Sequence, residues 1–481
     1  MGGSVRQPDG ARDPGNTAGR APAHEPRRVR PGPITPADYA ALAEGPARAA
    51  AFDALARVAR RVPVADAVEE AARHAKLSRA DRRLAVQLAY GVLRHKSLLD
   101  FWIAKRTHAP LEPAVANVLR LAFFQVAFLD RIPEYALVSS AVEQAKRVAP
   151  QAQGLVNAVL RRRLDDRPLP EDLATRYSHP AWLVERWQQR WPADVEELLR
   201  AANQVPPLTL RVSPGWSRED LLADLAQHQV EAMASPLLPE AIRVDGALWL
   251  EDWEPFHAGG ATVMDESSMV AAHVLAPPPE SRVLDLAAGV GGKACHILQK
   301  WPSVSLAAWD IDGRRLKRLE ANAARLGVAG RLAIHEGDGT KLTPAQVGRV
   351  DAVLLDAPCT GLGVLRRRVD ARWRRRESDP RAHQALQLEL LEAAWRVVAA
   401  EGPVVYSICS VEPEETVDVL RHFARRHPEA AFDPVGPLLP SAALRRRAQG
   451  PYLTWRPAEE RLDGLFVARL VKRAPGPGGL R

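Results

Sequence analysis

Cysteine is scarce in this chain: Cys295, Cys359 and Cys409 are the only ones among 481 residues. Three cysteines cannot form a disulfide framework, and no two of them make the Cys-x-x-Cys pair that is typical of zinc sites. We therefore expect no metal site, and a reducing cytoplasm suits the sequence.

Long apolar runs are absent as well. No stretch of 18 apolar residues occurs, and the N-terminus lacks the apolar core of a signal peptide. The sequence therefore predicts a soluble, cytoplasmic protein with no membrane partner.

Positive charge is in excess. The chain has 66 Lys and Arg against 58 Asp and Glu, a net charge of +8, and its pI is about 9.6. This excess favours a polyanionic partner, with nucleic acid as the first candidate, although many basic proteins bind no nucleic acid. The length and the hydrophobic fraction of 46% predict more than one domain.

Changes in pattern divide the chain into five parts. Residues 1–35 are rich in Gly, Pro, Arg and Ala and predict a disordered tail. Residues 36–168 repeat apolar positions at three and four, which predicts an all-helical domain. Residues 169–256 mix short helical and strand patterns and predict a small α/β joining region. Residues 257–473 predict an α/β domain, and residues 474–481 a flexible tail.

The α/β domain is predicted from strands that alternate with helices, the pattern of a largely parallel doubly wound sheet. The expected helices lie near 293–300, 313–326, 381–399 and 413–426, and the expected strands at 283–286, 304–309, 331–334, 352–355, 404–408 and 464–470. In the joining region we expect a helix at 221–230 and strands ending at 212 and spanning 241–244 and 248–250.

Reactive side chains follow two of these strands. The strand at 352–355 runs into Asp356, Pro358 and Cys359, and the strand at 404–408 runs into Cys409. Ligands bind at the carboxyl ends of strands in open α/β sheets, so these groups lie where chemistry takes place. The alternative is that both cysteines are small buried hydrophobic residues.

A glycine-rich turn follows the strand at 283–286. Such a turn before a helix lets a ligand lie against bare backbone, and Asp310 ends the next strand, where an acid can bind a ribose diol. A nicotinamide nucleotide would also suit these features, but the spacing is not Gly-x-Gly-x-x-Gly. Asp338, after the third strand, could accept a hydrogen bond from an adenine amino group or be a solvated loop acid.

Arginines cluster after the Cys359 strand, at Arg366–Arg368 and Arg372–Arg376. Next to a pocket for a polyanion we favour phosphate contact over a solvated charged loop. Trp373 lies among them and could stack on a base or pack against protein. The basic run Arg161–Arg163 suits the negative end of a helix dipole.

Ordered motifs resemble a known family. The phrases at 88–94, 128–133 and 154–161 look like the NusB-type helical RNA-binding domain. The motifs at 265–268, 285–293, 310–312, 356–361, 363–367, 409–415 and 463–464 occur in the order of the Sun/Fmu (RsmB) family of S-adenosylmethionine-dependent RNA cytosine-5 methyltransferases.

The resemblance implies a Rossmann-like methyltransferase domain and assigns roles by matching positions. Cys409 is the expected nucleophile, Cys359 its partner, and Asp356 the third catalytic residue. The S-adenosylmethionine site is expected at Ala287, Ala288, Gly289, Val290, Gly291, Gly292, Lys293, Asp310, Asp338 and Asp356.

The chain departs from the family at two places. The cofactor loop has Val290 where the family has proline, which puts cofactor affinity in doubt. Ile408 precedes the catalytic cysteine where the family has threonine, so a hydroxyl near the thiol is lost.

The expected activity is methylation of C5 of a cytosine in 16S ribosomal RNA by a monomer. A thiolate that adds to C6 makes C5 nucleophilic, and the target base must leave its stack to reach the pocket. The alternatives are a tRNA cytosine-5 methyltransferase and a catalytically weak RNA-binding or ribosome-assembly factor. A DNA methyltransferase is disfavoured by the RNA-family motif at Cys409.

Overall fold

The computed structural model describes residues 45–129, 133–161, 167–245, 248–457 and 462–473. The tails predicted at 1–35 and 474–481 lie outside these residues. Within the described ranges, no helix combines the length and the apolar character that crossing a bilayer requires.

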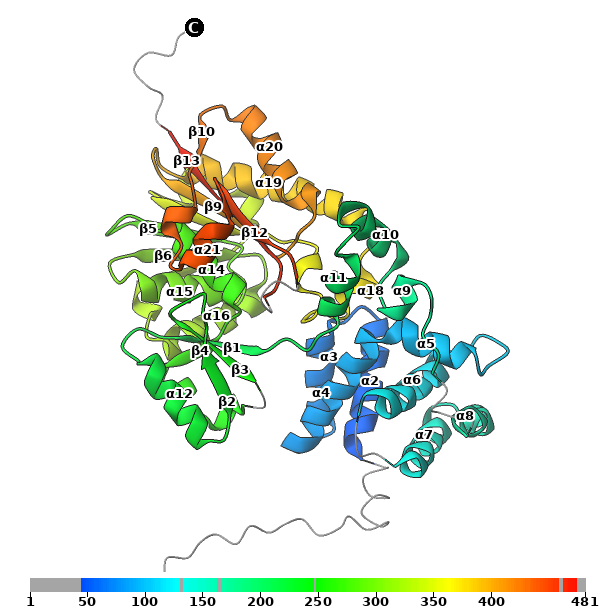
Figure 1. Cartoon of the computed structure of the whole chain (residues 1–481). Helices are drawn as coiled ribbons and strands as arrows, with labels where there is room; N and C mark the ends of the chain where they lie inside the picture. Colours follow the sequence, from blue (N-terminus) through cyan, green and yellow to red (C-terminus); the bar gives the residue numbers. More distant parts are fainter. Residues whose placement is uncertain (1–44, 130–132, 162–166, 246–247, 458–461, 474–481) are drawn as a thin grey trace, which may run out of the picture.

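The N-terminal part is all helical, as predicted (Figure 1). Helix α6 lies in the core, where Leu119 and Phe123 are fully buried. Helix α4 begins after Ser78, whose hydroxyl accepts a hydrogen bond from the amide of Asp81, a common start for a helix. The helices are α2 (Pro46–Ala59), α3 (Val64–His74), α4 (Arg79–Arg94), α5 (Lys96–Ala104), α6 (Pro113–Phe128), α7 (Glu134–Val148) and α8 (Gln153–Leu160).

In the described residues, the joining region begins with three helices, and a small sheet with a fourth helix follows. The first three helices are α9 (Leu173–Arg176), α10 (Ala181–Arg190) and α11 (Val195–Ala202). The antiparallel sheet has the order β2-β3-β1-β4 and is flanked by α12 (Arg218–Gln227). Its strands are β1 (Leu208–Val212), β2 (Glu231–Ala234), β3 (Ala241–Asp245) and β4 (Ala261–Val263).

One predicted strand of this region is wrong. Residues 250–252 form the 3-10 turn η2 (Leu250–Asp252), and Trp253 packs in the core of the small sheet. The apolar run Leu248-Trp249-Leu250 was the reason for predicting a strand. The chain turns at these residues instead, and the turn brings Trp253 into the core. Strands β2 and β4 were not predicted.

The large sheet has nine strands in the order β11-β12-β13-β9-β8-β5-β6-β7, with β10 paired to β13. The five strands from β9 to β7 are parallel, as expected of a doubly wound sheet, and β13 is antiparallel to β9. The six predicted strands are confirmed, whereas the short β10, β11 and β12 were not predicted. The strands are β5 (Arg282–Leu286), β6 (Ser305–Asp310), β7 (Leu332–Glu336), β8 (Ala352–Asp356), β9 (Pro403–Ile408), β10 (Ala430–Phe432), β11 (Ala448–Gln449), β12 (Tyr452–Trp455) and β13 (Leu465–Lys472).

Helices cover both faces of this sheet. Alternate residues of β8 point to opposite faces, so Leu354 packs in one core and Leu355 in the other. Helices α14, α15 and α16 bury their apolar sides in the first core, and α19 and α20 in the second. The helices of this part are α13 (Glu254–His257), α14 (Glu266–Leu275), α15 (Gly292–Lys300), α16 (Gly313–Arg325), α17 (Pro344–Val347), α18 (Ala371–Arg374), α19 (Asp379–Val397), α20 (Val417–Arg426) and α21 (Ala442–Arg447).

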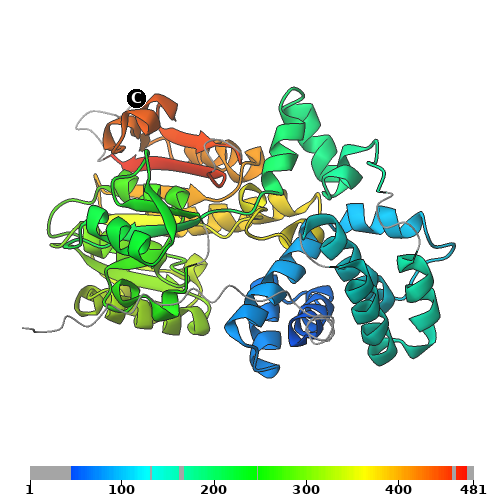
Figure 2. The ribbon, with the colours of Figure 1, turned by 60° about the horizontal axis from the view of Figure 1, so that its bottom comes forward.

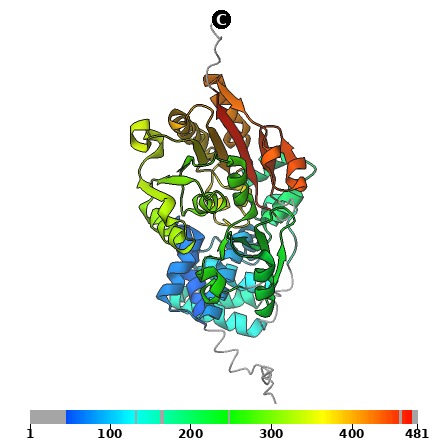
Figure 3. The same ribbon diagram turned by 90° about the vertical axis from the view of Figure 1, so that its left-hand side faces the viewer.

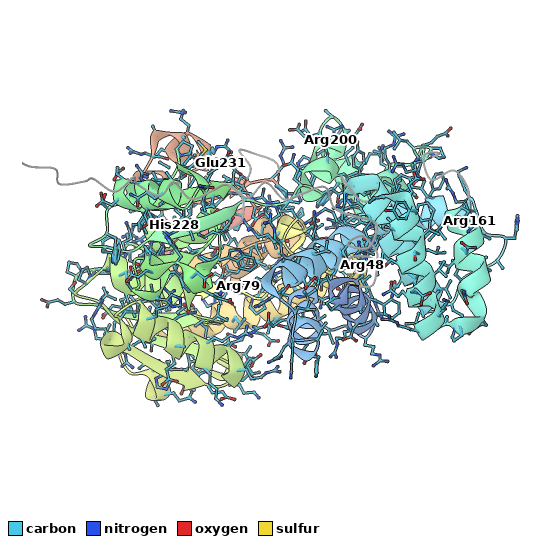
Figure 4. All side chains as sticks on the ribbon, turned by 90° about the horizontal axis from the view of Figure 1, so that it is seen from below. Arg48, Arg79, Arg161, Arg200, His228 and Glu231 are labelled. Carbon is cyan, nitrogen blue, oxygen red and sulfur yellow. The ribbon has the colours of Figure 1, made fainter. Side chains whose placement is uncertain are left out.

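The helical domain lies beside the α/β part, and the yellow segment that includes α18 lies between them (Figure 2). Seen from the side, the helical domain lies below the large sheet (Figure 3). Arg79 of α4, labelled in Figure 4, reaches the joining region and donates a hydrogen bond to Asp252. The helical domain therefore contacts both of the other parts.

The arginine cluster forms the joint between these parts, which corrects the prediction of phosphate contact for Arg366 and Arg372. Both side chains are buried: Arg366 pairs with Asp463, and Arg372 donates to the carbonyls of Ser178 and Ala202. An isolated buried charge is costly, so each guanidinium is surrounded by acceptors from distant segments. For the exposed Arg368 and Arg376, phosphate contact stays a prediction.

Trp373 packs against protein at this joint. The sequence alone had allowed both stacking on a base and packing against protein. Its indole N–H donates to the carbonyl of Leu93, and the Lys96 ammonium lies 5.3 Å from its ring centre. Of the basic run at 161–163, the structure describes only Arg161, which donates to the Asn157 side chain.

Replacing Arg372 should loosen the joint. We expect Arg372→Met to lower the free energy of unfolding by about 2–4 kcal/mol, because buried carbonyl groups lose their donors. Thermal denaturation measures the loss, with Arg376→Met, an exposed arginine of the same segment, as the control. Equal melting temperatures for the two variants would contradict a structural role for Arg372.

Candidate active site

Two neighbouring parallel strands bring the catalytic candidates together. In the sheet, Asp356 of β8 is paired with Ser407 of β9, and the amide of Ala357 donates to the Ser407 carbonyl. Cys409 follows β9 directly, and Cys359 follows β8 after a proline. Their Sγ atoms lie 3.1 Å apart although 50 residues separate them in the sequence.

The two thiols differ in acidity. The hydrogen bond from Cys359 lowers the pKa of Cys409 despite the opposing effect of burial, and the guanidinium of Arg368 lowers it further. The same hydrogen bond, together with burial, raises the pKa of Cys359 well above its usual value. The two shifts have opposite signs, so they favour Cys409 as the more acidic thiol and Cys359 as the one that keeps its proton.

Glu415 holds the two cysteine loops in position. Its buried carboxylate accepts hydrogen bonds from the backbone amide and hydroxyl of Thr360, next to Cys359, and from the hydroxyl of Ser410, next to Cys409. Gln387 of α19 donates to it as well. In the sequence, Glu415 belongs to a family motif but had no assigned role. That role could not be predicted, because the hydrogen-bond partners of Glu415 come from three separate segments.

A second contact between backbones supports the Cys409 loop. The amide of Gly363 donates to the Cys409 carbonyl, and the amide of Gly464 donates to the Gly363 carbonyl. A Cβ atom on Gly363 would lie only 2.8 Å from the Cys409 oxygen. Glycine at this position therefore allows the close approach that fixes the loop.

The glycine-rich turn follows β5 as predicted and has an unusual backbone. Ala287, Gly289 and Gly291 all have positive φ angles. At Gly291 a side chain is also excluded by space, because a Cβ atom would lie 2.5 Å from Leu319 Cγ. A Cβ atom at Gly289 or Gly292 would meet nothing within 4 Å, so this face of the turn is open to a ligand.

Asp310 is buried at the end of β6 and shapes this turn. One carboxylate oxygen accepts from the amide of Gly289 and the other from the amide of Asp312, at 2.8 and 2.9 Å. Asn322 donates to the carbonyl of Val290, the residue that stands in place of proline. Asp338 accepts hydrogen bonds from Thr340, which lower its pKa, and begins a short turn after β7.

Lys293, predicted to contact the cofactor, connects the turn to the catalytic strand end. Its ammonium lies 2.5 Å from a carboxylate oxygen of Asp356. Burial opposes the charge of Lys293, but the attraction of Asp356 outweighs it, so the pKa of the lysine is raised. Ala288 packs against the core that contains α15.

Asp285 is a candidate that the sequence reasoning missed. It lies in β5 within the motif of the turn, is almost completely buried, and neither carboxylate oxygen has a hydrogen-bond partner in the described part of the chain. Burial, reinforced by Asp356, raises its pKa to about 7. A strand position gives no sign of such an environment, since the neighbouring charges come from other strands.

Potential metal ligands gather at one place in the described ranges: Glu240, His273 and His296. Both imidazoles lie within hydrogen-bonding or ion-pair distance of one oxygen of Glu240, at 2.5 and 3.4 Å. The trio connects the small sheet to α14 and α15. The expectation of no metal stays a prediction.

Comparison with known proteins gives three family matches. A model described as 16S rRNA methyltransferase RsmB/F matches residues 272–471, and the NusB family matches residues 45–165. A ferredoxin-like domain of RsmF/B-like methyltransferases matches residues 179–251.

Individual proteins agree with these matches. The chain is 36% identical over 409 residues to the ribosomal RNA small subunit methyltransferase B of Klebsiella pneumoniae, covering 83% of this chain and 92% of that protein. The crystal structure of PH0851 superposes with a TM-score of 0.76 at 27% identity, over 89% of this chain and 98% of that one. The structure of NSun6 from Pyrococcus horikoshii with SFG shares the fold, with a TM-score of 0.53 at 21% identity over 62% of this chain and 99% of that one.

The acidity of the thiols can be tested by alkylation. We expect iodoacetamide to label Cys409 at lower pH than Cys359, with a midpoint below the ordinary thiol value of about 8.5. In Cys359→Ala the midpoint for Cys409 should rise, because the donor that stabilises its thiolate is gone.

Mass spectrometry between pH 6 and 10 measures the labelling of each site. Cys295 is the internal control, since it is fully buried and burial raises its pKa to about 11. Labelling of Cys359 and Cys409 with one common midpoint would contradict the assignment.

Proposed function

The chain belongs to the RsmB/F family of 16S rRNA methyltransferases, and from that premise we propose that it methylates C5 of a cytosine through a covalent bond to Cys409. The methyl donor of this family is S-adenosylmethionine. The observation that carries the proposal is the pair of thiols 3.1 Å apart at adjacent strand ends. Lys293 and Asp356 lie beside that pair and join it to the cofactor turn.

The residues present fit the cofactor. The open face of Gly289 and Gly292 leaves room for a ligand against the backbone at the start of α15, and Asp310 holds the turn in this shape. When bound, S-adenosylmethionine supplies an electrophilic methyl group. Ala287 to Lys293, Asp310 and Asp338 form or border its site in this proposal, and Asp310 retains lone pairs for a ribose diol.

Covalent chemistry explains the choice of a thiol. The Cys409 thiolate adds to C6 of cytosine, and the electron pair displaced from the C5–C6 double bond makes C5 nucleophilic. S-adenosylmethionine would supply the methyl group to C5, and its sulfonium would leave as the neutral thioether of S-adenosylhomocysteine. In this proposal Asp356 holds the N3/N4 edge of the base, and its ion pair with Lys293 orients the carboxylate.

Release of the product needs a second group. The C5 proton leaves, its electron pair restores the C5–C6 double bond, and the C6–S bond breaks to return the Cys409 thiolate. Cys359 is the side chain placed to assist the proton transfer. In the resting site its raised pKa keeps it protonated, as the hydrogen-bond donor to Cys409. Once Cys409 is bound to C6, the hydrogen bond that raises this pKa is gone, so Cys359 can lose its proton to solvent and its thiolate can then accept the C5 proton.

The helical domain is the proposed source of RNA affinity. The NusB-type domain lies beside the catalytic part, so one RNA can contact both. We propose 16S ribosomal RNA as the substrate, a cytoplasmic location and a monomer. A tRNA substrate remains the alternative, and bisulfite sequencing of both RNAs with and without the gene tests it. A lost methylcytosine in 16S RNA supports the proposal, and an unchanged 16S RNA refutes it.

A catalytically weak RNA-binding or assembly factor is the second candidate, because Val290 replaces the family's proline in the cofactor turn. Calorimetry with S-adenosylmethionine separates the two. No binding at millimolar cofactor would favour the assembly factor.

The two cysteines should fail at different steps. We expect Cys409→Ala to give neither product nor adduct, whereas Cys359→Ala should form the bond to C6 and then stall. The stalled state is a protein–RNA band of retarded mobility on a denaturing gel, which should depend on S-adenosylmethionine and vanish in the double variant. An adduct trapped by Cys409→Ala instead would reverse the roles.

Asp310 should act on cofactor binding more than on chemistry. Loss of a hydrogen-bonding carboxylate costs roughly 1.5–3 kcal/mol, so Asp310→Ala should weaken S-adenosylmethionine binding about 10- to 150-fold. Calorimetry measures the affinity, with Asp312→Ala as the control, since the Asp312 carboxylate caps α16 by accepting from the Arg314 amide and, among the described residues, accepts no hydrogen bond from the turn. A rate that saturating cofactor does not restore would give Asp310 another role.

A further inference from the structure

A basic cavity lies beside the Cys409 loop. It has a volume of about 390 Å³ and opens between the end of α10, the segment after Cys409, and the α21–β12 region. Ligand pockets commonly begin at about 300 Å³. The residues that give it its chemistry are Arg190, Trp191, Arg446, Arg447 and Arg456, and Val411 forms part of its wall. We call it the basic pocket.

The wall of the basic pocket is continuous with the active site. Val411 is two residues beyond Cys409, and its carbonyl accepts a hydrogen bond from the Arg190 guanidinium. On the other side, Trp455 donates to the carbonyl of Asp463. The next residue, Gly464, forms the backbone contact with Gly363 that supports the Cys409 loop. The pocket wall is therefore joined to the Cys409 loop through Val411 and through Asp463 and Gly464.

Positive charge dominates the pocket. No acidic side chain is among the described residues that line it. Asp194 pairs with Arg456 from outside the lining, and Glu412 and Glu414 pair with Arg186. Burial lowers the pKa of Arg190, and the nearby carboxylates of Glu412 and Glu414 offset part of that effect. The pocket is suited to an anion.

An aromatic surface accompanies the charge. The guanidinium of Arg190 lies 4.2 Å and that of Arg456 5.7 Å from the ring centre of Trp191. Arginines around a partly exposed tryptophan are the combination that proteins use to bind single-stranded nucleic acid, because they serve both phosphate and sugar or base.

We propose that the basic pocket binds a phosphodiester of the substrate RNA strand close to the target cytosine, with Trp191 against the adjoining nucleoside. This rests on the proposed function, because a cytosine that reaches Cys409 must leave its stack and draw its flanking backbone against the same loop. Arg190 and Arg446 are the exposed arginines of the set; the Arg190 guanidinium already donates to the Val411 carbonyl, so Arg446 is the one that we expect to meet the phosphate directly.

Adjacent arginines of α21 provide a matched pair for the test. Arg446 lines the pocket, whereas Arg445 is exposed on the same helix and bonds to the carbonyl of Pro440. Filter binding of transcribed 16S ribosomal RNA over a range of salt concentrations measures both. We expect Arg446→Ala to weaken RNA binding about 3- to 10-fold and to reduce the salt slope by about 0.7, the value for one single-strand phosphate.

The position of Arg446, in the basic pocket and away from the cofactor turn, predicts the kinetic and cofactor-binding results as well. Arg446→Ala should raise KM for RNA without changing kcat or the calorimetric affinity for S-adenosylmethionine, Arg446→Lys should keep the salt slope, and Arg445→Ala should change RNA binding less than 2-fold. Equal losses in Arg445→Ala and Arg446→Ala, or no loss in either, overturn the proposal.

Two further outcomes identify the source of the anion and the step at fault. If inorganic phosphate binds the wild-type protein but the Arg446 variants bind RNA normally, the pocket is a small-anion site and the proposal is overturned. If the RNA-binding differences appear but no RNA is ever methylated, the pocket is supported and the proposed function is what fails.

Discussion

The adjacency of β8 and β9 is the constraint on which the site depends. The two strands are neighbours in the sheet although α19 and a long connection separate them in the chain. Parallel pairing ends both strands at one edge, so the side chains that follow must meet. The pairing of Asp356 with Ser407 then leaves Cys359 and Cys409 within contact. A slip of register between these strands would separate the thiols.

Charged side chains surround the pair of thiols, Cys359 and Cys409. Asp285, Asp310 and Asp356 lie on neighbouring strand ends, and their mutual repulsion is offset by Lys293 from the glycine-rich turn. The same lysine and Arg368 favour the Cys409 thiolate. The glycine-rich turn and Cys409 are therefore electrostatically coupled, and a substitution of Lys293 would alter both.

The arginines that give the sequence its excess positive charge fall into two classes in the structure. Arg366 and Arg372 are buried and satisfy carboxylates and carbonyls at the joint of the three parts, so they are unavailable to RNA. Other arginines, such as Arg190 and Arg446, line a cavity beside the catalytic loop. Net charge alone does not separate these classes, because burial depends on which distant segment supplies the partner.

The sequence by itself determined the all-helical domain, the order of strands and helices in the α/β domain, the glycine turn, and the strand ends that carry Asp310, Asp356, Cys359 and Cys409. These features depend on local periodicity and on residues close together in the chain, which a sequence displays directly. The tertiary structure alone decided the rest. The short strands β10 to β12, the turn at Leu250–Asp252, the ion pair of Lys293 and Asp356 and the role of Glu415 all depend on partners from remote segments, and the energy of such contacts exists only once the chain has folded.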